Sequence, residues 1–421
     1  MRDKRRLVEW GKDALIVLLT LSAVWLLSMT PLIQDSGLLD LFAPQESPGV
    51  GAGGGGQATA MLPARLAITG EGGRCGIQYD EQRLEELFPP LGALLGDALA
   101  SAGQSEVISE EQWRLRLGLQ GVYFDFAGEV PLPALERWLQ GPGSTKLTGS
   151  ARRVLLCAGE GDQVLLCWQG GERGDFFSCA TALTQSLHLE PATAGTASNG
   201  AYFAFENQAL SQVLAPYTLV TEEEPKVEGC TVSVPLAGEE ERLAVLSALS
   251  FNSQNPAPVS GGEVYLDGGD RLVVSASGTV SYRAAGGEKY PAGPTLADGV
   301  EAARTLAEGA LSPLCGQARL YLMSVDQAQG VLRVRFGYRL SGCAVHLGSE
   351  GWAAEFLVRD GYISQFTLRF RCYAAGGEAS LLLPMEKAAV MLPDLSARRR
   401  ELVLQYLDSG GTQVSPQWVA E

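Results

Sequence analysis

The sequence predicts an α+β protein in which an N-terminal transmembrane helix precedes extracytoplasmic domains built of antiparallel sheets and helices. Two observations carry this prediction. Residues 14–33 contain no charged side chain, and at about 1.5 Å per helical residue they cover roughly 30 Å, the thickness of a bilayer core. Farther along, strand-like segments follow one another through turns such as 326–330 and 359–361, without helices between them, which is typical of an antiparallel sheet.

The charges that flank the uncharged stretch predict its orientation. Five basic residues lie within the first twelve positions, and the next basic residue after the stretch is Arg65. By the positive-inside rule, residues 1–13 form a cytoplasmic basic tail, residues 14–33 cross the cell membrane once, and the bulk lies outside the cytoplasm. A cleaved signal peptide is the alternative, but its apolar region spans about 7–15 residues and ends in a small-x-small site. The longer stretch and Pro31 favour an uncleaved anchor.

Three anchor residues are candidates for helix–helix contact. Thr20 and Ala23 are small enough to let a second helix approach closely, and Trp25 lies beside them in the sequence. The alternative is that all three face lipid.

Charge and composition limit the functions that this chain can have. The 421-residue chain suggests two or three domains, and its 46% hydrophobic content is sufficient for real cores. It holds 32 basic against 48 acidic residues, a net charge of −16. Because five of the cations lie in the N-terminal tail, the exterior is still more acidic than the whole chain and repels phosphate backbones. Nucleic acid is therefore not expected as a partner.

The eight cysteines are an even number, and an exterior location permits disulfides. However, no CxxC occurs, and residues such as Cys157 and Cys167 end apolar runs. We expect mostly reduced cysteines that pack as small hydrophobic side chains.

The remaining chain divides into a linker and three exterior domains. Residues 34–60 are glycine-rich and read as a linker; the run at 51–56 matches a phosphate-loop pattern only nominally, since no strand precedes it. Residues 61–225 are expected to form a first α+β domain, 226–293 a small middle α+β domain, and 294–421 a helix on an antiparallel meander.

The expected elements follow from hydrophobic periodicity and turn residues. Expected helices are 80–102 (interrupted at Pro89 and Pro90), a short one from 109, 134–139, 176–187, 239–249 and 296–311. Expected strands are 61–68, 121–126, 152–157, 163–168, 229–234, 263–266, 272–275, 278–282, 318–323, 331–338, 352–358, 362–373, 401–407 and 412–419.

No pattern in the sequence indicates catalysis, a cofactor or a metal. His188 and His346 have no neighbouring cysteine or carboxylate at ligand or relay spacing. The acidic runs 222–224 and 239–241 resemble paired catalytic carboxylates, but adjacent glutamates at a helix start more often interact with the helix dipole. We therefore expect a protein that is not an enzyme and holds no catalytic, cofactor-binding or metal-binding residues.

Two stretches carry a resemblance to a known family. The first combines an apolar helix end, a loop with Asn and Pro and a tyrosine-bearing hairpin, and the second is a closing hairpin; they cover residues 246–252, 262–268, 271–274 and 278–282, and residues 402–406, 410–411 and 414–418. Both resemble the YycH/YycI family, membrane-anchored accessory regulators of the essential cell-wall two-component system of low-GC Gram-positive bacteria. The polyglycine linker and the eight cysteines depart from the family pattern.

The resemblance implies a non-enzymatic regulator. Its anchor would pair with the transmembrane helices of a sensor histidine kinase, and its exterior would contact that kinase or a sister regulator. Two alternatives stay open: a membrane-tethered module that binds the cell envelope and, less favoured, a wall hydrolase or transferase.

Overall fold

The structure, a computed structural model, describes residues 62–420 except 140, 142, 172–173, 223–224, 226, 253, 255, 287, 377–381 and 392–399. All of these belong to one compact unit, Gln57–Glu421. The expected tail (1–13), transmembrane helix (14–33) and linker (34–60) lie outside the described residues and stay predictions. Within the described residues, the expected α+β class with antiparallel sheets is confirmed.

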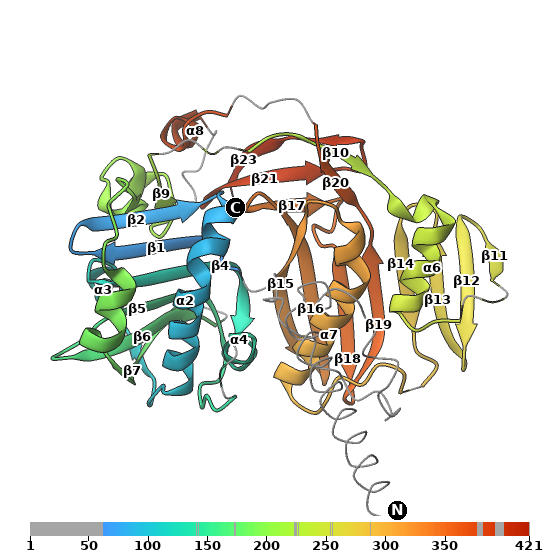
Figure 1. Ribbon diagram of the computed structural model, residues 1–421, viewed down its shortest axis with the longest axis horizontal. Coiled ribbons are helices and arrows are strands. Elements are labelled where there is room, and N and C mark those ends of the chain that lie inside the picture. The colour runs from blue at the N-terminus through green and yellow to red at the C-terminus, as the bar shows by residue number, and fades with distance from the viewer. Residues whose placement is uncertain are drawn as a thin grey trace, which may run out of the picture. The chain divides into compact units, whose positions relative to one another are not determined.

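The first sheet is antiparallel and has seven strands in the order β2-β1-β4-β5-β6-β7-β3 (Figure 1). Its strands are β1 (Arg65–Gly70), β2 (Gly73–Gln78), β3 (Glu106–Ile108), β4 (Gly121–Pro131), β5 (Ser150–Ala158), β6 (Gln163–Gly170) and β7 (Asp175–Thr184). The expected hairpin of residues 152–157 and 163–168 is confirmed as β5 and β6. Its turn is closed by the Gly159 N–H, which donates to the Gln163 carbonyl at 2.8 Å.

Helix α2 (Glu81–Ala100) packs against this sheet (Figure 1). Asp80 caps its start as expected, since its carboxylate accepts a hydrogen bond from the Arg83 N–H at 3.0 Å. The expected interruption at Pro89 and Pro90 is wrong, because the helix continues through both. Two prolines remove backbone donors, but burial of a long apolar face offsets that loss. The largest buried side chains of this helix are Leu84, Phe88, Leu91, Leu94, Leu95 and Leu99.

The helix expected at residues 176–187 is also wrong. Residues 175–184 form β7, which pairs with β6, and only a five-residue π-helix at Gln185–Leu189 follows. Phe177 stacks on Trp168 of β6 with ring centroids 5.3 Å apart. Cross-strand aromatic pairs of this kind stabilise a sheet. The pairing with β6, and not the local sequence pattern, therefore makes residues 175–184 a strand.

The second sheet has eleven strands. Ten follow the order β11-β12-β13-β14-β19-β18-β16-β17-β21-β23, and β15 pairs with β16. The strands are β11 (Ala257–Val259), β12 (Gly262–Asp267), β13 (Asp270–Ser275), β14 (Thr279–Arg283), β15 (Arg319–Ala328), β16 (Val331–Leu340), β17 (Cys343–Leu347), β18 (Ala354–Arg359), β19 (Tyr362–Arg369), β21 (Leu402–Asp408) and β23 (Pro416–Ala420). All pairs are antiparallel except β17–β21, which is parallel and was not anticipated.

Helix α7 (Leu296–Leu311) covers part of this sheet and contacts β16, β18 and β19 (Figure 1). Its bounds match the expected helix. Thr295 and Asp298 form a capping box, in which the Thr295 hydroxyl accepts from the Asp298 N–H at 3.1 Å. Small buried residues such as Ala303 and Ala307 let the helix approach the strands closely.

The other elements are short. They are α3 (Glu110–Leu117), α4 (Leu132–Trp138), α5 (Glu190–Thr193), α6 (Glu239–Ala248), α8 (Met385–Met391), β8 (Tyr202–Phe203), β9 (Leu219–Val220), β10 (Cys230–Ser233), β20 (Cys372–Ala375) and β22 (Gln413–Val414). The expected strand 362–373 is in fact split: β19 stays in the large sheet, whereas β20 joins a three-stranded sheet with β10 and β22.

Strand pairing crosses one expected domain boundary. β14 comes before residue 294 and pairs over its whole length with β19, which comes after it. The large sheet therefore continues from the expected middle domain into the expected C-terminal domain. The division into separately folding domains stays a prediction.

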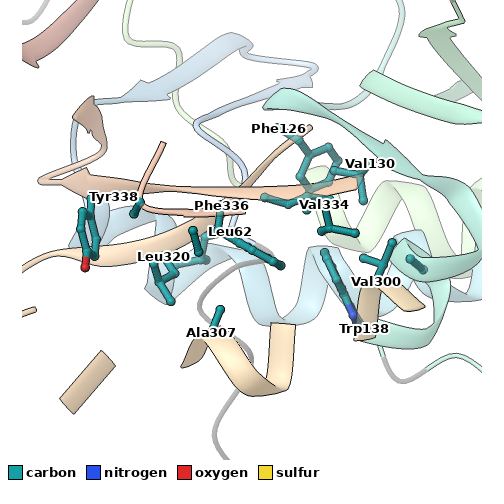
Figure 2. Close-up of a cluster of buried hydrophobic side chains, with 14 of the residues drawn as sticks. Leu62, Phe126, Val130, Trp138, Val300, Ala307, Leu320, Val334, Phe336 and Tyr338 are labelled. Atoms are coloured by element: carbon teal, nitrogen blue, oxygen red, sulfur yellow. The ribbon is translucent and has the colours of Figure 1, made fainter. Parts of the chain in front are cut away.

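The two large sheets share one apolar core (Figure 2). Apart from Leu62, which precedes β1, the side chains labelled in the figure come from β4, α4, α7, β15 and β16; they are Leu62, Phe126, Val130, Trp138, Val300, Ala307, Leu320, Val334, Phe336 and Tyr338. Between Asp125 and Val130 the register of β4 shifts, and Ala127 adopts a positive φ of 63°. This bulge brings Gly128 against the backbone of β15, where a β-carbon would lie 2.5 Å from the Met323 carbonyl oxygen.

We predict that Gly128→Ala destabilises the protein by about 1–3 kcal/mol, because the added methyl group collides with backbone that cannot move without separating the sheets. The matched control is Gly309→Ala in α7. A β-carbon at Gly309 meets nothing within 4 Å, so this change is expected to stabilise the helix by about 0.5–1 kcal/mol. Chemical denaturation of both variants measures the difference, and equal effects would contradict the close approach.

Candidate functional site

The three candidate contact residues of the anchor, Thr20, Ala23 and Trp25, lie outside the described residues, so the structure neither brings them together nor separates them. Within residues 62–420, apart from the gaps given above, no helix is both long and apolar enough to cross a bilayer.

A row of polar side chains crosses the seven-stranded sheet. Arg65 of β1 lies opposite Asp125 of β4, and Asp125 lies opposite Arg153 of β5. Gln169 of β6 lies opposite Arg153 in turn. Directly opposite side chains lie on the same face of an antiparallel sheet, about 4.5–5.5 Å apart, so strand register alone brings these groups together. Arg65 Nη1 donates to Asp125 Oδ2 at 2.9 Å, and Arg153 Nη1 donates to Gln169 Oε1 at 2.7 Å.

Glu401, the residue before β21 of the other large sheet, completes this row. Its carboxylate accepts hydrogen bonds from Arg65, from Arg152 Nη2 at 2.5 Å and from Arg153 Nη2 at 2.9 Å. Arg65, Asp125, Arg153 and Glu401 are buried, and Arg152 is partly exposed. We call Arg65, Asp125, Arg152, Arg153 and Glu401 the charge cluster. It joins the seven-stranded sheet to the eleven-stranded sheet.

Electrostatics keep both carboxylates of the charge cluster ionised. Burial by itself raises the pKa of Asp125, but Arg152, Arg65 and Arg153 together hold that pKa well below its usual range. Burial likewise raises the pKa of Glu401, and the same three guanidinium groups more than reverse the effect. Three positive charges therefore face two negative ones inside the protein.

A second buried ion pair fixes the end of β21. Arg371 donates to both carboxylate oxygens of Asp408, from Nε at 2.8 Å and from Nη2 at 2.7 Å. Tyr373 of β20 donates its hydroxyl proton to Asp408 at 2.8 Å, and the Gly410 N–H donates to the same carboxylate at 2.9 Å. Both carboxylate oxygens of Asp408 therefore accept hydrogen bonds from neighbouring protein groups, which indicates a structural role for this pair.

The histidines and the acidic run 239–241, which the sequence presents as possible site residues, have no functional partner among the described residues. His188 Nδ1 accepts from the Thr184 N–H at 3.1 Å, which closes the turn after β7, and His346 is exposed on β17. Residues 239–241 lie in the first turn of α6, where glutamates favour the helix dipole as expected. The described residues contain no group of three or more His, Cys, Asp or Glu side chains that could hold a metal ion.

The cysteines are buried as expected, except Cys372, which is half-buried, and the structure has all eight as free thiols. Cys167 has polar neighbours: Arg116 Nη1 lies 3.3 Å from its sulfur, and the Ser178 hydroxyl oxygen lies 3.5 Å from it.

Helix α8 presents an apolar groove at the surface. The groove has a volume of about 500 Å³ and is lined by residues including Leu210, Leu383, Val390 and Met391. Val390 is 78% exposed and Met391 is 70% exposed. Exposed apolar side chains that gather in this way are typical of protein contact surfaces.

Sequence reasoning missed the charge cluster, although a signal was present. Arg152 and Arg153 open the apolar strand RRVLLC, and Asp125 interrupts the apolar run VYFDF. Ionisable residues inside a strand that is otherwise apolar are almost never buried unless paired. The pattern therefore indicates buried partners, but it does not identify Glu401.

Comparison with known proteins identifies the fold. The crystal structure of YycH from Bacillus subtilis superposes with a TM-score of 0.55 over 87% of this chain and 95% of that chain, at 9% sequence identity. This chain has a YycH-like fold. An uncharacterized protein from Eubacterium rectale ATCC 33656 aligns with a TM-score of only 0.31 over 46% of this chain and 76% of that chain, at 11% identity. No family model and no curated protein sequence matches the chain.

We predict that Glu401→Gln destabilises this YycH-like fold by about 3–5 kcal/mol, because it leaves three buried or partly buried arginines with one carboxylate. The control is Glu85→Gln, whose carboxylate lies 3.3 Å from Arg319 in an exposed pair. Exposed pairs contribute about 0–1 kcal/mol. Urea denaturation compares the two, and a Glu401→Gln effect as small as that of Glu85→Gln would remove the charge cluster from the stability of the fold.

We also predict a pH dependence with a definite sign. The pKa values of Asp125 and Glu401 are lowered in the folded state, whereas unfolded carboxyl groups titrate near about 4. Their contribution to stability is therefore complete above about pH 5 and is lost as the pH falls through the folded pKa values. The difference in unfolding free energy between wild type and Glu401→Gln should be constant from pH 5 to 7 and shrink below about pH 4. A difference that grows in acid would contradict the assignment.

Proposed function

We propose that this chain is a membrane-anchored accessory regulator of a sensor histidine kinase in a cell-wall two-component system, and that it is not an enzyme. The observation that carries the proposal is the YycH-like fold, which spans most of both chains. The resemblance of residues 246–282 and 402–418 to the YycH/YycI family supports it from the sequence. The exposed apolar groove at α8 supports a role in protein contact.

In this proposal residues 14–33 span the cell membrane with the N-terminus in the cytoplasm, and the described residues lie outside. The anchor packs against a transmembrane helix of the kinase, and the exterior contacts the kinase or a sister regulator. Control requires only that the regulator bind two kinase states with different affinity. A difference of about 1.4 kcal/mol changes the ratio of the two states tenfold.

The test exchanges the anchor. Replacing residues 14–33 by an unrelated uncharged helix of equal length should abolish kinase control, because the helix–helix contact is lost while the exterior stays intact. The matched control keeps Thr20, Ala23 and Trp25 in the unrelated helix and should restore part of the control. A kinase-dependent transcriptional reporter in cells measures both, and protease added outside the cells checks the topology.

Two outcomes would contradict the proposal. Full control after the exchange would remove the anchor from the mechanism. Released exterior that binds peptidoglycan or teichoic acid and does not co-purify with a kinase would favour the envelope-binding module instead.

A further inference from the structure

A cavity of about 190 Å³ lies beside the charge cluster, between the two large sheets. Arg65 and Arg152 of the charge cluster reach its wall from the seven-stranded sheet. Arg339 of β16 lines it from the eleven-stranded sheet, and Met323 and Val403 give it an apolar side. The cavity is therefore apolar with a cationic end, which is the usual construction of a site for a small amphiphilic ligand.

Arg339 is the unusual group in this wall. Its side chain is buried, with 3% of the residue exposed. Nη1 donates to the carbonyl oxygens of Leu62 at 3.0 Å and Pro63 at 3.3 Å. Nε and Nη2 are buried and have no hydrogen-bond partner among the described residues. Arg152 also lines the cavity and its Nε has no hydrogen-bond partner, but its Nη2 pairs with Glu401. Buried polar groups are normally hydrogen-bonded, so Arg339 has donors available for an acceptor.

The nearest carboxylate does not fill that role. Glu81 Oε1 lies 3.7 Å from Arg339 Nε, beyond hydrogen-bond distance. Burial lowers the pKa of Arg339 more than the charge of Glu81 raises it. By contrast, the pKa of Arg153, at the heart of the charge cluster, is raised because its carboxylate partners outweigh burial. Arg339 thus lacks the compensation that the charge cluster provides.

Tyr79 supplies a second donor at the cavity. Its hydroxyl oxygen accepts from the Leu404 N–H at 3.1 Å, and no described residue is recorded as accepting its proton. Around the cavity, Arg339 adds to the three positive charges of the charge cluster, against the carboxylates of Asp125, Glu401 and Glu81. In a chain of net charge −16, this is a locally cationic interior.

We propose that this cavity binds a small oxyanion-bearing molecule, a carboxylate or phosphate with a short apolar body. Its oxygens accept hydrogen bonds from Arg339 and from the Tyr79 hydroxyl, and its body lies against Met323 and Val403. A metal cation does not fit, because three guanidinium groups, those of Arg65, Arg152 and Arg339, line the wall. Since the lining comes from both large sheets, the bound molecule stabilises their association.

The experiment titrates the full-length protein by isothermal titration calorimetry with two probes, inorganic phosphate and butyrate. Phosphate presents the head alone, and butyrate presents a carboxylate with an apolar body. The wild type is expected to bind at least one of them, and the stronger probe identifies the head group. Arg339→Gln is expected to weaken binding about tenfold or more, the loss of one charge-assisted hydrogen bond.

Two further variants make the result decisive. Arg335→Gln removes the same charge from the same strand, where Arg335 pairs with Glu355 at 2.7 Å, and it should leave binding unchanged. Ala344→Leu fills the cavity from β17 without removing a charge, and it should abolish binding even where Arg339→Gln fails to fold. Absence of binding to the wild type, or undiminished binding by Ala344→Leu, would overturn the proposal.

Discussion

Pairing of the buried charges between Glu401 and the arginines of the first sheet is the constraint on which the described fold depends. Arg65 and Glu401 are 336 positions apart in the chain, so their contact joins the start of the described chain to its last strands. Removing a buried charge from its partner is far costlier than losing an exposed pair. If the two large sheets separated, Glu401 would lose its three guanidinium partners, whereas Asp125 would keep its own because they lie on the same sheet.

The charge cluster and the apolar core have different tasks. A buried ion pair contributes little net stability compared with apolar residues of the same size, and here the apolar core shared by β4, β15 and β16 supplies the favourable burial. The polar row specifies register instead. If β4 slipped by one residue against β1 or β5, Asp125 would turn to the opposite face of the sheet. Apolar packing thus holds the sheets, and the charges determine how they are aligned.

Local patterns predicted much of the fold and little of this junction. The β5–β6 hairpin and the bounds of α7 follow from turn residues, caps and periodicity, which act within a few positions. The pattern of residues 176–187 predicts a helix because the pairing of this segment with β6 is a tertiary contact, and the parallel β17–β21 pair has no local signature. Arg152, Arg153 and Asp125 are ionisable residues inside apolar strands, which indicates buried partners. Glu401 meets these residues only in the folded chain, so no local pattern identifies it as their partner.

The described residues differ in how well their buried polar groups are satisfied. In the charge cluster and the Arg371–Asp408 pair, each guanidinium group donates to a carboxylate, so a change there is costly. Arg339 donates to no carboxylate: two of its nitrogen atoms have no hydrogen-bond partner among the described residues, and Glu81 lies 3.7 Å away. A rearrangement of Arg339 breaks its two hydrogen bonds to the carbonyl oxygens of Leu62 and Pro63, whereas a change in the charge cluster separates buried ion pairs. Movement on the Arg339 side of the junction therefore costs less than movement that breaks those ion pairs.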